Sequence, residues 1–213
     1  PVSHCETPTM ANSAPPGRLL AFDLETTGLE PRRDAVVAVG CVPVEERTIL
    51  WGRAYRALVD DPRSLRPRDL DALGTHQVLP EEQRGGLGLG ELVDLVGAHL
   101  GAGTIVLAHG ASIERGFLVE AARATGRPAL SLRTVDTLGY LRAIERVRPH
   151  LTDRLPAGAA RYASLPTALG AVRAFFGLPA YPEHEPLFDA LATAELYLLL
   201  SHRFPELHPG VQS

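Results

Sequence analysis

Two acidic residues inside an apolar run constrain this chain more than any other feature. Asp23 and Glu25 interrupt the segment from Arg18 to Gly28, which is otherwise largely apolar and ends in a Thr-Thr-Gly turn signal. Side chains two residues apart in a β-strand point to the same face, so the two carboxylates would lie side by side. Like charges at that spacing repel each other, and such a pair is costly unless a cation neutralises it. We therefore expect a first strand that presents oxygen ligands to a divalent ion such as Mg²⁺ or Mn²⁺.

The composition excludes several classes of protein. With 213 residues, 45% hydrophobic and 22% charged, the chain is neither disordered, collagen-like nor a coiled coil. No apolar run reaches the roughly 18 to 20 residues of a membrane span, so we expect no membrane partner. The two cysteines, Cys5 and Cys41, are too few for a disulfide framework, which favours a reducing, cytoplasmic setting. A net charge of −4 argues against a broad nucleic-acid-coating surface but permits a small footprint on a strand end.

The rest of the chain alternates short apolar runs, typical of strands, with segments of helical spacing. Further strands are expected at residues 35–44, 48–59, 104–108 and 131–136, and helices at residues 91–100, 113–125, 137–147, 165–176 and 186–204, with a short helix around 70–73 in a lid-like crossover. No internal repeat or long linker separates two cores. We therefore expect one α/β domain over residues 18–204 with a mixed sheet, between a disordered leader at 1–17 and a short tail at 205–213.

A second acidic segment lies near the C-terminus. Pro186 marks the first turn of a helix, where its missing amide proton is not needed. This places His184 on the loop before that helix and Asp189 in its first or second turn, where the helix dipole favours an ionised acid. Because Pro182 and Pro186 flank the loop, it can bring the imidazole back towards the acid. The alternative for this segment is a helix-capping Asp beside a surface His.

Three segments of the chain resemble the motifs of the DEDDh family of 3′–5′ exonucleases. They are Asp23-Leu-Glu25-Thr-Thr-Gly, then His109-Gly-Ala-Ser-Ile-Glu114-Arg-Gly-Phe-Leu, then His184 with Asp189 five residues later. The family includes the proofreading epsilon subunit of bacterial DNA polymerase III and RNase T. The likeness extends from about Leu19 to His202, and it implies a ribonuclease H-like (exonuclease) fold, with a mixed five-stranded sheet flanked by helices.

The resemblance also implies an activity. Members of the family hydrolyse phosphodiester bonds from the 3′ end, which for this chain implies single-stranded DNA as substrate and nucleoside 5′-monophosphates as products. Carried over residue by residue, Asp23, Glu25 and Asp189 would bind two divalent ions, Mg²⁺ or Mn²⁺, with Asp23 bridging both. Two such ions can hold the attacking and leaving oxygens of an in-line displacement. His184 would take the proton from the attacking water, since its ordinary pKa lets it be neutral at working pH.

The second motif departs from the family at two positions. Gly110 and Glu114 stand where family members usually have Asn and Asp. Glutamate keeps the charge and reaches one methylene further, so we include Glu114 among the catalytic and metal-binding residues. The alternative is a solvent-facing helix residue paired with Arg115 or Arg123.

The turn after the first acids is expected to meet the substrate. In relatives the positions of Thr26, Thr27 and Leu29 contact the terminal sugar and base. Backbone amides and a small apolar wedge at this turn would tolerate any base, as a sequence-blind exonuclease requires.

Three other features leave more than one interpretation open. His109 ends an apolar strand, and it either orients the site or is a structural histidine, so we leave it out of the catalytic set. Asp136 is expected to cap a helix. The arginines between residues 142 and 161 form either a path for a nucleic-acid strand or a solvated surface.

Two alternatives to a DNA exonuclease follow from the same residues. No residue discriminates the sugar, so an exoribonuclease or oligoribonuclease-type activity on RNA or short oligonucleotides is the alternative within the same chemistry. The alternative of a different class is a catalytically weak, end-binding accessory module, in which Gly110 and Glu114 mark decay of the site. Against decay, four positions of the family pattern are intact, namely Asp23, Glu25, His184 and Asp189. The sequence identifies no polymerase or other protein partner.

Overall fold

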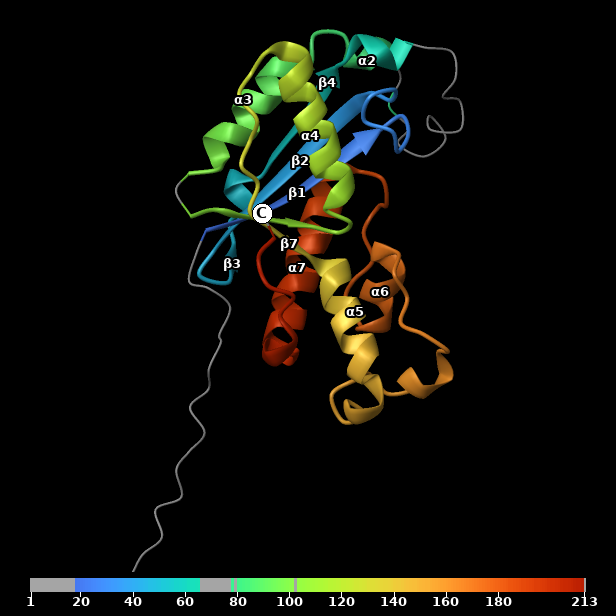
Figure 1. The fold of residues 1–213 in the computed structure, drawn as a ribbon. Coiled ribbons are helices and arrows are strands. Elements are labelled where there is room, and N and C mark those ends of the chain that lie inside the picture. Colours follow the sequence, from blue (N-terminus) through green and yellow to red (C-terminus); the bar gives the residue numbers. More distant parts are fainter. Residues whose placement is uncertain (1–17, 66–77, 79, 102, 213) are drawn as a thin grey trace, which may run out of the picture.

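The computed structural model describes residues 18–65, 78, 80–101 and 103–212. This part of the chain forms a mixed sheet covered by helices on both faces (Figure 1). The leader at 1–17 and the short helix expected around 70–73 lie outside the described residues. No helix in the described part is long and apolar enough to cross a membrane.

The sheet has the spatial order β5-β4-β2-β1-β6-β7, and β3 pairs with β2 outside this path. The strands are β1 (Leu19–Thr26), β2 (Val36–Glu45), β3 (Thr48–Ile49), β4 (Tyr55–Asp60), β5 (Leu87–Gly88), β6 (Ile105–Ala108) and β7 (Thr134–Asp136). β2 runs antiparallel to β1 and β4, whereas β6 runs parallel to β1 and β7. The mixed sheet is therefore confirmed. The expected number of strands is wrong, because the described residues contain seven, two of them only two residues long.

The expected strand at residues 48–59 is also corrected. It is interrupted by the 3₁₀ helix η1 (Trp51–Arg53), which separates β3 from β4. Gly52 lies at the centre of this interruption, and glycine weakens a strand interior because it has no side chain to pack.

Six α-helices are described, namely α2 (Pro80–Gln83), α3 (Leu89–His99), α4 (Ser112–Thr125), α5 (Thr137–Val147), α6 (Leu169–Phe175) and α7 (Pro186–Arg203). α5 has the expected bounds and α7 ends one residue earlier than expected. α6 begins four residues later than expected, because a residue before a proline disfavours the helical region and Pro166 follows Leu165. The remaining short elements are 3₁₀ helices, namely η2 (Pro62–Leu65), η3 (Arg148–His150), η4 (Ala159–Arg161) and η5 (Pro205–Leu207).

The alternation of side chains along β1 decides which face carries the acids. Leu20 and Phe22 belong to the core under α3 and α4. Leu19 and Ala21 belong to the core on the other face, under α5, α6 and α7. Asp23 and Glu25 continue this second series, since side chains alternate in a strand. The two carboxylates therefore share the face that α7 covers, as the spacing predicts.

The N-terminus of α7 lies directly against the sheet beside Asp23. In the antiparallel register Asp23 pairs with Gly40 of β2. A Cβ on Gly40 would overlap the carbonyl oxygen of Pro186, the first residue of α7. Gly40 therefore permits the close approach that brings the helix to the acids. The sequence analysis missed this role, although a glycine inside a valine-rich strand signals close backbone contact.

Residues 205–212, expected as a short tail, pack on the domain. They begin with η5, and Gln212 then forms a two-hydrogen-bond bridge with Thr134 of β7. The N–H of Thr134 donates to the Gln212 carbonyl at 2.7 Å, and the N–H of Gln212 donates back at 2.8 Å.

Candidate active site

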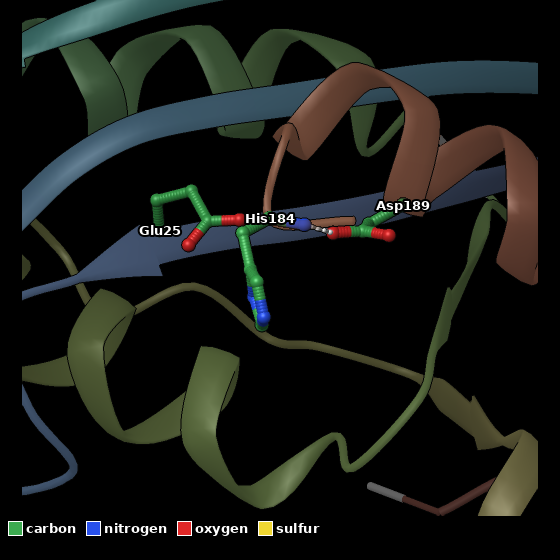
Figure 2. Close-up of side chains that lie close together, drawn as sticks. All are labelled: Glu25, His184 and Asp189. Atoms are coloured by element: carbon green, nitrogen blue, oxygen red, sulfur yellow. Dashed lines mark hydrogen bonds between the residues drawn. The ribbon is translucent and has the colours of Figure 1, made fainter. Parts of the chain in front are cut away.

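Three potential metal-binding groups meet at the end of β1. One ring nitrogen of His184 and one carboxylate oxygen each of Glu25 and Asp189 lie within 4.8 Å of one another (Figure 2). Glu25 comes from β1, His184 from the loop before α7, and Asp189 from the first turn of α7. The imidazole of His184 is exposed, whereas Glu25 is buried and Asp189 is half-buried. The first and third sequence motifs are therefore brought together.

The backbone of His184 explains how the loop returns to the helix. Its φ of 62° is in the left-handed region, and its N–H donates to Oδ2 of Asp189 at 2.9 Å (Figure 2). The N-cap of α7 is Glu185, whose carboxylate accepts from the N–H of Phe188 at 3.0 Å. The alternative of Asp189 as the helix cap is therefore wrong, because Glu185 has that role.

Asp23 lies among the other acids of the site. The pKa of its carboxyl is raised well above the usual range, first by burial and then by the charges of four carboxylates, namely Glu114, Glu25, Asp189 and Glu185. Asp23 is not one of the three groups that meet within 4.8 Å. It lies two residues before Glu25 on the same face of β1, and it therefore belongs to the same acidic cluster.

Glu114 enters this cluster from α4. β6 is the parallel neighbour of β1, and α4 begins shortly after β6 ends, at the same end of the sheet as the end of β1. Glu114 is only 8% exposed, and burial is the main cause that raises its pKa to about 8. Its Oε2 atom has no hydrogen-bond partner within the described part of the chain. A buried oxygen without a partner is costly, and a bound cation would satisfy it.

The alternative of a solvent-facing Glu114 is wrong. Arg123 forms its ion pair with Glu120, at 2.6 Å. Arg115 donates from Nη2 to the hydroxyl of Thr134 at 2.9 Å. Glu114 instead points into the protein, as its burial shows.

The remaining acids also have raised pKa values. Burial is the main cause that raises the pKa of Glu25 to about 7, and the charges of Asp189 and Glu185 add to it. Burial likewise raises the pKa of Asp189 to about 6, although the N–H of His184 opposes the change. Several carboxylates at this separation cannot all be ionised near neutral pH without a compensating cation. Their oxygens are hard ligands, and the set therefore fits divalent ions such as Mg²⁺ or Mn²⁺.

The unusual glycine of the second motif has a structural reason. Gly110 has a φ of 105°, which side chains rarely adopt, and its N–H donates to Oδ1 of Asp136 at 3.0 Å. Asp136 also caps α5, as expected, by accepting from the N–H of Leu138 at 2.9 Å. Gly110 is therefore a requirement of the turn and gives no support to decay of the site.

His109 is a structural histidine. One ring nitrogen lies 2.7 Å from the hydroxyl of Thr137 and the other 2.7 Å from the carbonyl oxygen of Thr167. Both nitrogens are thus engaged within the fold, which agrees with the exclusion of His109 from the catalytic set.

The turn after β1 uses its two hydroxyls internally. The hydroxyl of Thr26 donates to the carbonyl oxygen of Gly28 at 2.7 Å, and the hydroxyl of Thr27 accepts from the N–H of Ala35 at 2.9 Å. Leu29, by contrast, is 71% exposed. Leu29 is therefore exposed at this turn, while the hydrogen bonds of Thr26 and Thr27 hold the turn in place.

Two arginines of the 142–161 segment are used inside the fold. Arg148 donates to the carbonyl oxygen of Ala159 at 2.9 Å and to that of Ala163 at 3.2 Å. Arg154 pairs with Glu206 after α7. Neither side chain extends freely towards a nucleic-acid strand.

Glu185 and Arg56 are parts of the site that the sequence analysis missed. Glu185 contributes charge to the acidic cluster and pairs with Arg56 of β4. Arg56 is opposite Gly40 in the sheet register and therefore lies in the same row as Asp23. The position of Glu185 directly before Pro186 is typical of a helix cap, but no sequence pattern predicts its ion pair with Arg56 of a distant strand.

Comparisons with known proteins identify the architecture. No protein-family model matches the chain. The PolC-type DNA polymerase III of Thermotoga petrophila is 24% identical over 194 residues, which cover 88% of this chain and 12% of that protein. E. coli exonuclease I in complex with a dA16 oligonucleotide superposes with a TM-score of 0.73 at 17% identity, over 90% of this chain and 42% of that chain. The chain has the fold of exonuclease I.

This result confirms the expected ribonuclease H-like architecture. The zinc-bound form of the E. coli exonuclease I complex with single-stranded DNA gives a TM-score of 0.74 at 17% identity, again over 90% of this chain and 42% of that one. The chain thus spans less than half of exonuclease I, and a much smaller share of the PolC-type polymerase.

Proposed function

We propose that this chain is a metal-dependent 3′–5′ exonuclease that releases nucleoside 5′-monophosphates from single-stranded DNA. The observation that carries the proposal is the meeting of Glu25, Asp189 and the exposed imidazole of His184 within 4.8 Å at the end of β1, on the fold of exonuclease I. Support for the substrate comes from exonuclease I, which has been solved with single-stranded oligonucleotides, and from the likeness to a PolC-type polymerase.

In this proposal the acids hold two divalent ions. Asp23, Glu25, Asp189 and Glu114 supply the ligands, and the unpartnered Oε2 of Glu114 is the strongest sign that an ion belongs there. When bound, the ions would act as Lewis acids on the phosphate and stabilise the charge of the transition state.

His184 acts as the general base of the proposed reaction. It accepts the proton of the water that attacks phosphorus, while the 3′ oxygen of the preceding nucleotide leaves. The exposed imidazole is open to that water, and its ring nitrogen lies within 4.8 Å of oxygens of Glu25 and Asp189.

The substrate side of the proposal rests on Leu29. This exposed side chain follows the turn that Thr26 and Thr27 hold, close in sequence to the acids. An apolar contact with a terminal base carries no sequence information, so we propose cleavage that does not depend on sequence.

The buried free thiol of Cys41 supports a reducing, cytoplasmic setting.

The test compares three 5′-labelled substrates: single-stranded DNA, duplex DNA and RNA. Each is incubated with Mg²⁺, Mn²⁺ or EDTA, and the released nucleotides are identified by chromatography. We expect single-stranded DNA to shorten from its 3′ end with either metal, and no change in EDTA. Faster loss of RNA than of DNA would favour the exoribonuclease, whereas end binding without cleavage under every condition would favour an accessory module.

A further inference from the structure

A buried arginine lies behind the loop that carries His184. Arg173 of α6 is only 2% exposed. Its Nη1 donates to the carbonyl oxygen of Ala192 at 2.8 Å, and its Nη2 donates to the carbonyl oxygen of Pro179 at 2.9 Å. Nη2 also forms an ion pair with Glu195 of α7 at 2.7 Å. One guanidinium therefore joins α6, α7 and the start of the His184 loop, and these bonds offset the cost of burying its charge.

Tyr181 extends this connection to within three residues of His184. The guanidinium of Arg173 lies 4.7 Å from the centre of the Tyr181 ring, in a cation–π contact. The Tyr181 hydroxyl donates to Oε1 of Glu195 at 3.0 Å. The other neighbour of the ring is Phe188, stacked with a centroid separation of 5.7 Å. Tyr181 is thus held by α6 and α7 together.

The same cluster adjoins the acidic site. A cavity of about 90 Å³ between α6 and α7 is lined by Arg173, Tyr181, Glu183 and Asp189, among others. Glu183 lies against Gly170 of α6, where an added Cβ would overlap its carboxylate. The loop therefore contacts α6 both through Tyr181 and through Glu183.

The backbone of His184 requires such packing. A residue other than glycine in the left-handed region is strained and persists only where the surroundings determine it. The hydrogen bond from the His184 N–H to Asp189 fixes one end of the loop. Arg173, through Pro179 and Tyr181, fixes the other end.

We infer that Arg173 is a positioning residue, which holds the His184 loop so that the imidazole reaches the attacking water. This inference rests on the proposed exonuclease function. Arg173 is buried and does not meet the substrate. Its effect on the reaction is therefore indirect.

The first test replaces the guanidinium by an apolar side chain of similar length. Arg173→Met removes the bonds to Pro179, Ala192 and Glu195. We expect kcat on single-stranded DNA to fall by about 10- to 100-fold, because part of the contribution of a general base is lost. KM should stay within about threefold of the wild type, because no substrate contact is removed.

A double-mutant cycle with His184→Ala separates positioning from general damage. If Arg173 acts through the imidazole, Arg173→Met should change kcat by less than about twofold in the His184→Ala background. If the double variant instead loses kcat by the product of the two single losses, the inference is overturned, because Arg173 would then act on something other than His184.

Two further variants keep the test decisive if Arg173→Met does not fold. Tyr181→Phe keeps the ring and removes only the hydroxyl bond to Glu195. It should lower kcat by about 3- to 10-fold, and this loss should also disappear in the His184→Ala background. Arg123→Met is the matched control, since it removes a largely exposed arginine from an ion pair with Glu120 on α4 and should leave kcat unchanged.

Failure of the inference differs from failure of the proposed function. A wild-type chain that degrades no single strand with Mg²⁺ or Mn²⁺ would remove the function itself. The function would stand if the wild type is active and the His184→Ala variant is impaired. If, in addition, the losses from Arg173→Met and His184→Ala multiply in the double variant, only the role of Arg173 is removed.

Discussion

Gly40 of β2 and Pro186 of α7 are in direct backbone contact, and no Cβ fits between them. Because Gly40 pairs with Asp23 in the sheet register, this contact brings the first turn of α7 to Asp23 and the acidic cluster around it. A strand residue with no side chain is thus what allows two distant segments of the chain to build one site.

The first prediction concerns this contact. Gly40→Ala forces α7 away from β1, so we expect the free energy of unfolding to fall by about 2 to 4 kcal/mol and exonuclease activity to fall further than stability alone explains. Denaturant unfolding and cleavage of a labelled strand measure the two effects. Gly52→Ala is the control, because an added Cβ there meets nothing within 4 Å. Equal effects of the two substitutions would contradict the role of Gly40.

The second prediction concerns the buried Glu114. Its pKa is raised from 4.5 to about 8, so the folded chain binds this proton more tightly than the unfolded chain, and folding stability falls as pH rises between those values. Glu114→Gln is neutral at every pH. Without metal it should be more stable than the wild type by about 1 to 3 kcal/mol at pH 8 and little different at pH 5. Unfolding curves in EDTA at both pH values measure this, and an equal difference at both would refute it.

The third prediction concerns metal binding and pH. Protons compete with the ions for Glu25, Asp189 and Glu114, whose pKa values are raised to about 7, 6 and 8. Mg²⁺ should therefore raise the melting temperature by about 3 to 8 °C at pH 8 and clearly less at pH 6. Asp23→Asn should abolish the shift. Asp94→Asn, which removes an exposed acid paired with Arg127, should retain it.

The fourth prediction separates two roles of His184. If His184 is the general base and not a metal ligand, as we propose, His184→Ala should lower kcat by about 10²- to 10³-fold. The variant should keep the full stabilisation by Mg²⁺, measured by thermal unfolding. Loss of that stabilisation would instead make the imidazole a metal ligand, which its distance from Glu25 and Asp189 also permits.

The parts of the site that the sequence predicts are those set by local geometry. The shared face of Asp23 and Glu25 follows from strand alternation, and the position of Asp189 follows from Pro186 at the start of α7. Both depend on residues only a few positions apart, where spacing fixes direction.

The parts that were missed depend on residues far apart in the sequence. The ion pair between Glu185 and Arg56 joins a helix cap to a strand, and the bond between Arg173 and Glu195 joins two helices. No periodicity in the sequence encodes such pairings.

The most direct measurement is the release of nucleotides from a 5′-labelled single strand by the wild type and by Asp23→Asn, each with Mg²⁺ and with EDTA. The wild type should shorten the strand from its 3′ end only with metal. The cleavage rate of Asp23→Asn with Mg²⁺ should be lower than that of the wild type by at least about 10³-fold. Equal cleavage by Asp23→Asn, or equal cleavage in EDTA, would contradict the proposal that these carboxylates hold the ions that cleave the strand.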